Sequence, residues 1–291
     1  MTKTLAAIAE LLRPYQWAKN GFVLVPVFFG RNLLHPDSAA RAAAAFAAFC
    51  IISSAVYIFN DWRDIEADRK HAKKRNRPLA SGRVSVGAAL TAMAVLLLAA
   101  FSISLLLPHK FLLCLCLYLV INIAYSLGLK HTPILEIFLV SSGFVIRLLA
   151  GGYAVNVEES TWVIAATLSI SMLLSVGKRR GDIARDNDLQ SSRKSLSGYT
   201  LSYLDAVLSA LTGTTLVVYL LFCVSDYAVG RYGQIVIVTA LPVAAGLLRY
   251  LQLLIVYKDG DAPTELLFSD KPMMAIVAAF IAIFGVLIYL G

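Results

Sequence analysis

Charged residues are scarce in this sequence. Asp, Glu, Lys and Arg make up only 15% of its 291 residues, whereas hydrophobic residues make up 59%, and the mean hydropathy is +0.74. A soluble globular domain carries about 25% charged residues, so this composition excludes an ordinary soluble protein. Apolar runs near the ~20 residues that cross a bilayer recur along the chain, with the charges between them. The sequence therefore predicts an all-α, polytopic integral membrane protein.

Cysteines are also few, and their positions exclude a metal or disulfide framework. All four lie in apolar runs: Cys50, Cys114, Cys116 and Cys223. They are interpreted as small buried hydrophobic residues. No linker or low-complexity tract divides the chain, so we expect a single transmembrane domain over residues 1–291. No cleavable signal peptide is evident, and residues of about 2–18 are expected to form an interfacial helix.

Nine membrane spans are expected from the apolar runs. The first carries Pro26 and Gly30, which disfavour a regular helix, and the sixth is short. The expected ranges are 20–36, 39–60, 86–107, 110–129, 132–155, 161–177, 203–223, 233–256 and 273–290.

Lys and Arg gather on one side of the expected bilayer. If the N-terminus is inside, most of the 26 basic residues fall in inside segments, chiefly 61–85 and 178–202. Because cytoplasmic loops collect Lys and Arg, this bias places the N-terminus and both segments on the cytoplasmic side of an inner or plasma membrane. Topology and attraction to anionic lipid explain the net charge of +8, so binding to nucleic acid is not expected.

The first acidic cluster follows the second expected span. On a helix, Asp61, Asp64 and Asp68 fall within about a 60° arc, and Asn60 widens the arc to about 100°. Oxygen-rich acidic clusters bind Mg²⁺ when the ion also bridges substrate phosphates, so a metal–diphosphate site is predicted. The alternative is a solvated helix end whose acids pair with neighbouring basic residues. The membrane edge disfavours this alternative, because ionisable groups there generally face a polar cavity.

A second charged segment follows the sixth span. Asp182 and Asp186 lie four residues apart on an expected helix, directly after Lys178, Arg179 and Arg180. The two segments are separated by four spans, which suggests a pseudo-repeat whose two charged helix ends face each other. Taken alone, paired acids of this kind are also typical of a surface helix.

The pattern Asn60-Asp61-x-x-Asp64-x-x-x-Asp68 at a cytoplasmic span end, with a second acidic motif four spans later, resembles the UbiA superfamily of intramembrane prenyltransferases. Within it, the chain is similar to the polyprenyl-phosphate phosphoribosyltransferases. It differs in carrying "RGDIARD" (180–186) where they have a Glu-containing helix. The likeness extends over "RPYQWAKN" (13–20), "NDWRDIEADRKHAKKRNRPLASG" (60–82), "YSLGLKHTPILEIFLVSSGFVIRLLAGG" (125–152), "GKR" (177–179), "RKSLSGYT" (193–200) and "LLRYLQLL" (247–254).

The resemblance implies a nine-helix bundle with an active-site cavity on the cytoplasmic side. It also implies Mg²⁺-dependent transfer of a 5-phosphoribosyl group from phosphoribosyl diphosphate to a polyprenyl monophosphate in the membrane, with release of diphosphate. The catalytic residues would be Asn60, Asp61, Asp64 and Asp68, and the metal ligands would be Asp61, Asp64, Asp68, Asp182 and Asp186.

A donor and an acceptor that both carry phosphate need cations around them. Arg147 stands out because it lies inside an apolar span, where a charged side chain must face a cavity or a partner. For the loop cations Lys19, Arg75, Arg77 and Lys130, positive-inside topology is the favoured explanation. The candidates for substrate binding are Lys19, Asn20, Arg75, Arg77, Tyr125, Lys130, Arg147, Lys178, Arg179 and Arg180.

Two other functions stay open at this point. An aromatic prenyltransferase, which moves a polyprenyl group from prenyl diphosphate to a phenolic acceptor, uses the same metal chemistry. Its flat acceptor needs few cations, whereas this chain is rich in cations near both motifs. A transporter or lipid-binding scaffold would place acids near the bilayer midplane, and the expected spans hold almost none apart from Glu136. A homo-oligomer is compatible with each of these functions.

Overall fold

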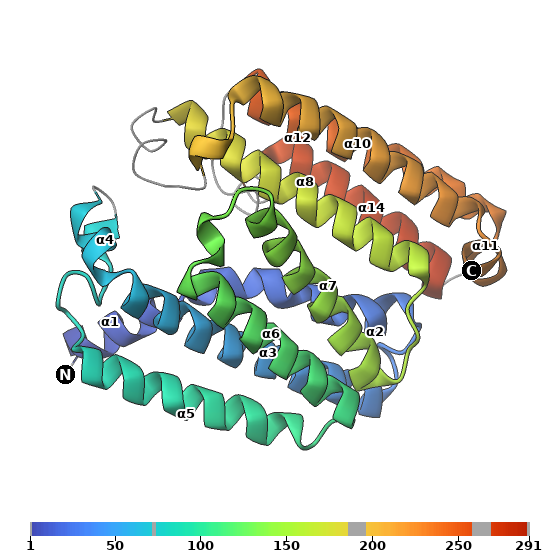
Figure 1. The fold of residues 1–291 in the computed structure, drawn as a ribbon. Coiled ribbons are helices and arrows are strands. Elements are labelled where there is room, and N and C mark those ends of the chain that lie inside the picture. The colour runs from blue at the N-terminus through green and yellow to red at the C-terminus, as the bar shows by residue number, and fades with distance from the viewer. Residues whose placement is uncertain (1, 72–73, 186–195, 258–268, 290–291) are drawn as a thin grey trace. The chain divides into compact units, whose positions relative to one another are not determined.

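The computed structural model describes residues 2–71, 74–185, 196–257 and 269–289 (Figure 1). These residues form α-helices and short 3₁₀ helices, and no strand occurs among them. The chain folds as two compact units, residues 1–130 with 146–158 and residues 131–145 with 159–291. Helix α7 (Leu135–Val155) contributes residues to both units.

Eight helices in the described part of the chain are long and apolar enough to cross a membrane. They confirm the all-α membrane class and match the second to ninth expected spans, with ends shifted by a few residues. The sixth, expected to be short, is one of the longest because its helix continues through the basic segment after residue 177. The eight are α3 (Pro36–Arg63), α5 (Val86–Ser104), α6 (His109–Leu127), α7, α8 (Thr161–Arg185), α10 (Leu201–Val224), η5 with α12 (Gln234–Thr239 and Ala240–Ile255) and α14 (Lys271–Tyr289).

The expected first span, 20–36, is wrong as a continuous membrane-spanning helix. A 3₁₀ helix, η1 (Pro14–Leu24), leads into the five-residue α2 (Val25–Phe29), and the chain then turns before α3 begins at Pro36. Pro26 supplies no backbone N–H for a regular helix, and Arg31 adopts a left-handed conformation with φ 61°. The described residues therefore hold eight candidate spans and not the expected nine.

The N-terminal helix is also shorter than the expected 2–18. Helix α1 covers Thr2–Leu12, and the helical path stops at Arg13, which has φ 52° and precedes Pro14. The pyrrolidine ring of a proline clashes with an α-helical residue before it, so the helix ends there.

In the first unit, α3 packs against η1, α5 and α6. Ala45 and Ala48 are fully buried, and such small side chains let helices approach closely. Phe49 of α3 forms edge-to-face contacts with Phe111 and Tyr118 of α6, at ring-centroid distances of 5.8 and 5.5 Å. The α3 residues of this core run from Ala42 to Val56, and the acidic cluster follows at the C-terminal end of the helix.

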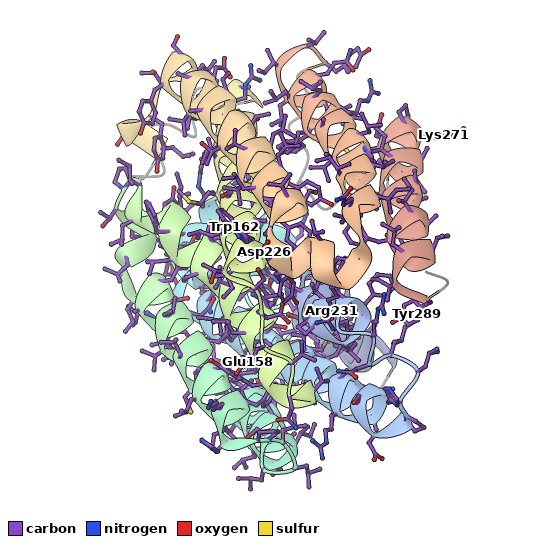
Figure 2. All side chains as sticks on the ribbon, turned by 90° about the vertical axis from the view of Figure 1, so that its right-hand side faces the viewer. Glu158, Trp162, Asp226, Arg231, Lys271 and Tyr289 are labelled. Carbon is purple, nitrogen blue, oxygen red and sulfur yellow. The ribbon has the colours of Figure 1, made fainter. Side chains whose placement is uncertain are left out.

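In the second unit, α10 packs against α8 and α12, and α12 packs against α14, which runs from Lys271 to Tyr289 (Figure 2). Leu173 of α8 is buried in the same core as Leu204 and Leu208 of α10. Gly177 has no room for a side chain, because a Cβ atom there would lie 2.1 Å from the hydroxyl of Tyr250. The end of α8 that carries the second motif is thus packed closely on α12.

Short helices connect the long ones. Thr200 caps α10 by accepting a hydrogen bond from the N–H of Tyr203, and Ser85 caps α5 in the same way through Ala88. The connecting helices are α4 (Ile65–Lys70), η2 (Lys74–Asn76), η3 (Leu129–His131), η4 (Leu196–Gly198) and α11 (Asp226–Tyr232).

Candidate functional site

The first acidic cluster lies where α3 passes into α4. Asp64 occupies the junction, with φ −98° and ψ 7°. The helical hydrogen bonds continue across it, since Asp64 N–H donates to the carbonyl of Asn60 at 3.0 Å and Asp68 N–H donates to that of Asp64 at 2.8 Å. The local break therefore keeps the acidic residues in successive helical turns, close to the predicted arrangement.

Asp61 and Asp68 converge on one cation. Nη1 of Arg77 lies 3.0 Å from Oδ1 of Asp61 and 2.7 Å from Oδ2 of Asp68. Both carboxylates are buried, with 2% and 4% of their side chains exposed, whereas Arg77 is 26% exposed. Arg77, which was predicted to bind substrate phosphate, thus forms ion pairs with two carboxylates of the cluster.

Asp61 has a second cationic partner, Arg13. Nη2 of Arg13 donates to both carboxylate oxygens of Asp61, at 2.5 and 2.7 Å. The guanidinium also lies over the ring of Tyr57, 5.1 Å from its centroid. Arg13, between α1 and η1, thus meets Asp61 near the end of α3, although the two residues are 48 positions apart.

Asp64 and Asn60 are connected to the end of α6. Nζ of Lys130, in η3, lies 2.5 Å from Oδ1 of Asp64, and the amide of Asn60 donates to Oδ2 of Asp64 at 3.2 Å. The hydroxyl of Ser126 donates to the Asn60 side-chain oxygen at 3.3 Å. The three carboxylates of the motif are therefore balanced by three cations, those of Arg13, Arg77 and Lys130.

The donor set of this cluster fits a hard divalent cation. All of its candidate ligands are carboxylate oxygens, which Mg²⁺ prefers, and two of them already meet at the positive Nη1 of Arg77. The described residues contain no group of three or more His, Cys, Asp or Glu side chains arranged to hold a metal ion. Binding of a metal would therefore need the ion pairs to rearrange.

Two further predicted residues, Asn20 and Arg147, lie together inside the first unit. Nε of Arg147 donates to Oδ1 of Asn20 at 2.7 Å, and its Nη2 donates to the hydroxyl of Tyr118 at 2.9 Å. The Asn20 amide donates to Ser53 at 3.2 Å. Asn20 is fully buried and Arg147 is 5% exposed. Arg147, a charge in an apolar span, thus has polar side chains as its partners, together with the ring of Tyr118, whose centroid lies 4.6 Å from the guanidinium carbon.

The second motif is built around a buried ion pair in the second unit. Nε and Nη2 of Arg179 each lie 2.7 Å from an oxygen of Glu136, in the first turn of α7. Nη1 of Arg179 lies 3.5 Å from Oδ2 of Asp182. Glu136 is fully buried, so this ion pair holds the Arg179 side chain against the first turn of α7.

Arg180 connects α8 to two other helices. Its Nε donates to Oδ1 of Asp205 in α10 at 2.9 Å, and its Nη1 donates to the carbonyl of Leu254 in α12 at 2.6 Å. Lys178 is exposed at the surface of α8. Of the cations predicted to bind phosphate here, the two arginines are therefore engaged with protein oxygens.

The remaining predicted residues are placed as follows. Arg75 is exposed in η2, and Lys19 and Tyr125 are partly buried in η1 and α6. Asp186, predicted as a metal ligand, lies outside the described residues.

These networks also hold residues that were not predicted as site residues: Arg13, Ser53, Tyr118, Ser126, Glu136 and Asp205. Glu136 carried a usable signal, because an acid inside an apolar span must have a partner, and Arg179 is a basic residue at a neighbouring span end. Arg13 directly precedes a proline at the membrane edge. A basic residue at this position is equally well explained by the preference of Lys and Arg for the cytoplasmic side of a membrane.

Comparisons of sequence and of structure with known proteins point to the same family. The model of the UbiA prenyltransferase family matches residues 23–284. Decaprenyl-phosphate phosphoribosyltransferase of Mycolicibacterium smegmatis is 33% identical over 98% of this chain and 93% of its own length. The protein of the same name from Corynebacterium glutamicum is 34% identical over 99% and 89%. A UbiA homolog from Archaeoglobus fulgidus, solved with GPP and Mg²⁺, superimposes with a TM-score of 0.74 at 20% identity, covering 97% of this chain and 98% of that one.

Proposed function

Because the chain belongs to the UbiA prenyltransferase family, we propose that it is a membrane-embedded transferase that moves a 5-phosphoribosyl group from phosphoribosyl diphosphate to a polyprenyl monophosphate. The observation that carries the proposal is the likeness, over nearly the full length of both chains, to two proteins named decaprenyl-phosphate phosphoribosyltransferase. The eight apolar helices and the family make the chain a multi-pass membrane protein. The excess of basic residues supports an inner or plasma membrane location with the N-terminus and both motifs on the cytoplasmic side.

The proposed reaction exchanges one bond at C1 of ribose. The bond from C1 to the diphosphate oxygen breaks, and the electron pair leaves with diphosphate. An oxygen of the polyprenyl phosphate forms the new bond to C1. This oxygen is already anionic near neutral pH, so the reaction needs no strong general base, in keeping with motifs that are rich in Asp, Lys and Arg. The main task of the protein is to stabilise negative charge on the departing diphosphate.

We assign that task to the first acidic cluster. Mg²⁺ held by Asp61, Asp64 and Asp68 would neutralise charge on the diphosphate. Arg77 and Lys130 lie within contact distance of these carboxylates, so they are placed to donate to phosphate oxygens beside them. Asn60 orients Asp64 by donating to its Oδ2. In the second motif, Asp182 and Asp186 remain the proposed metal ligands, and Lys178 is the exposed cation.

The test follows label into lipid. The full-length protein in nanodiscs is incubated with Mg²⁺, phosphoribosyl diphosphate labelled in the ribose, and a polyprenyl phosphate, and the lipid phase is counted. We expect label in the lipid that depends on both Mg²⁺ and the polyprenyl phosphate. Asp64→Asn should abolish it, because the variant loses a carboxylate of the cluster and the partner of Lys130. Glu66→Gln, at an exposed position of α4, is the matched control and should transfer normally.

The opposite result is equally clear. If no label enters the lipid, but prenyl diphosphate and a phenolic acid give a prenylated product, the protein is an aromatic prenyltransferase and the phosphoribosyl assignment is wrong. Transfer that continues after removal of divalent cations with EDTA would contradict the assigned role of Mg²⁺.

A further inference from the structure

The negative charges of the first acidic cluster are balanced by cationic side chains of the protein itself. Three buried or partly buried carboxylates, those of Asp61, Asp64 and Asp68, each contact a cation from Arg13, Arg77 or Lys130. We propose that Arg13 is a diphosphate-binding residue of this site that exchanges partners: it holds Asp61 in the empty site and moves to a phosphate oxygen when a divalent cation takes its place. The inference rests on the proposed function only in requiring a donor with a diphosphate group.

The geometry singles out Arg13 for such an exchange. Its Nη2 alone contacts both oxygens of Asp61. A guanidinium carries five N–H donors in a fork and can therefore also donate to two oxygens of a phosphate. Asp61 has a second partner in Arg77, 3.0 Å away, so the acid stays paired when Arg13 departs. Arg13 is 14% exposed on its side chain and so is less deeply buried than Asp61.

The backbone at Arg13 supports a functional role. Its φ of 52° and ψ of 57° place a residue with a long, charged side chain in the left-handed region, which costs free energy for any residue with a Cβ atom. Two backbone hydrogen bonds hold it there, from Arg13 N–H to the carbonyl of Glu10 at 3.2 Å and from Gln16 N–H to the carbonyl of Arg13 at 2.9 Å. The guanidinium also stacks over the ring of Tyr57. The strained turn thus aims the side chain at the end of α3.

Charge balance predicts how the ligands are coupled. A dication that arrives alone must displace a guanidinium from a carboxylate and leave that guanidinium without an anion. A diphosphate that arrives alone meets cations already neutralised by carboxylates. When both arrive, the metal takes the carboxylate and the diphosphate takes the guanidinium, so each ligand strengthens the binding of the other by the same factor.

Arg13→Gln should therefore change the two affinities in opposite directions. Without Arg13, the carboxylate of Asp61 is more available, so Mn²⁺ alone should bind about fivefold or more tightly than to the wild type. With Mg²⁺ saturating, inorganic diphosphate should bind about fivefold or more weakly, because a forked contact to phosphate is missing. A residue with a purely structural role would not produce a gain in one affinity and a loss in the other.

The experiment uses the full-length protein in detergent and needs no turnover. Mn²⁺ binding is measured from the electron paramagnetic resonance signal of free Mn²⁺, and diphosphate binding from retention of labelled inorganic diphosphate. Arg69→Gln is the matched control, since Arg69 pairs with the exposed Glu66 on α4 and its loss changes the charge equally. This control should leave both affinities at wild-type values.

Arg13→Lys guards against a folding defect in Arg13→Gln. It keeps the charge that holds Asp61 but loses the fork, so Mn²⁺ affinity should stay near the wild-type value while diphosphate affinity falls. Unchanged diphosphate affinity in Arg13→Lys, or an Arg13→Gln protein with both affinities lowered or both unchanged, would overturn the proposal. Failure of phosphoribosyl transfer would be seen separately, because both binding measurements use inorganic diphosphate and apply equally to a prenyl diphosphate donor.

Discussion

The guanidinium of Arg179 forms a two-pronged ion pair with the fully buried carboxylate of Glu136, with both N–O distances at 2.7 Å. Removal of one partner leaves the other charge buried and unbalanced, which typically costs about 3–5 kcal/mol. We expect Glu136→Gln to lower the free energy of unfolding by about 3 kcal/mol, since the amide retains one acceptor oxygen. The thermal denaturation midpoint of the detergent-solubilised protein measures the effect.

The double variant Glu136→Leu/Arg179→Met is the control for this ion pair. It removes both charges, so its midpoint should lie above that of Glu136→Gln and near the wild type. A double variant less stable than Glu136→Gln would show that Arg179 stabilises the unit mainly through other contacts, such as that with Asp182.

Lys130 gives a prediction on rate. Its Nζ contacts Asp64, and its side chain is only 9% exposed, so its charge is weakly screened by water. We expect Lys130→Gln to reduce kcat/KM for labelled phosphoribosyl diphosphate by about 10²–10³, the usual loss for one preorganised charge-stabilising donor. Lys70→Gln removes an exposed lysine of α4 and should leave the rate unchanged. A Lys130→Gln protein with wild-type kcat/KM would exclude Lys130 from the proposed site.

The contact between Gly177 and Tyr250 predicts a steric effect on stability. A Cβ atom at residue 177 would lie 2.1 Å from the Tyr250 hydroxyl and 2.8 Å from Cδ1 of Leu254. We expect Gly177→Ala to lower the free energy of unfolding by about 1–3 kcal/mol, the range for an overpacked core. Thermal denaturation measures this change as well.

Tyr250→Phe separates the clash from other effects. The buried Tyr250 hydroxyl has no hydrogen-bond partner among the described residues, so its removal should be neutral or slightly stabilising. In the Tyr250→Phe background, Gly177→Ala should cost less, because the nearest atom is gone. An equal cost in both backgrounds would mean that the close approach is relieved by another movement.

Glu159, between α7 and α8, predicts a dependence of stability on pH. Burial raises its pKa to about 7, and Arg231 of α11, labelled in Figure 2, only partly opposes this rise. Since the folded state binds the proton more tightly than the unfolded state, the stability from Glu159 is present at acidic pH and is lost as the pH rises through about 7. The change should be about 1–3 kcal/mol, with the lower values applying if water screens the carboxylate.

Thermal denaturation midpoints between about pH 5 and pH 8 test this expectation. Glu159→Gln should flatten the profile over this window, whereas Glu158→Gln, at the exposed neighbouring residue, should leave its slope unchanged. A Glu159→Gln profile as steep as that of the wild type would assign the dependence to another group.

The membrane spans were predictable because each depends on a local property. Twenty or so apolar residues between charged segments give a spanning helix whatever the rest of the chain does, and the last eight expected spans match helices of the structure. The first expected span fails for a reason that hydropathy does not register. Pro26 and the turn at Gly30 and Arg31 interrupt the helical hydrogen bonds, although residues 21–29 carry no polar side chain.

The acidic motif was predictable as a cluster, but its partners were not. Helical periodicity places Asp61 and Asp68 on one side, and Arg77 indeed contacts both. Nothing local indicates that Arg13 meets Asp61 or that Lys130 meets Asp64, because these pairs are separated by 48 and 66 residues. Asn20 and Arg147 were each predicted as substrate ligands, but the sequence did not indicate the hydrogen bond that joins them in the structure.

By itself, the sequence determined the all-α membrane class, the helix ends that carry the two charged motifs, and the membership of the UbiA prenyltransferase family through the spacing of Asn60, Asp61, Asp64 and Asp68. These properties follow from helical periodicity and from the exclusion of charge from the bilayer, which act over one or two turns. Only the tertiary structure decided which cation balances which acid, because the partners in ion pairs such as Arg13 with Asp61 and Arg179 with Glu136 are 48 and 43 positions apart in the chain. A buried charge must take whichever partner the packing of the helices brings within reach.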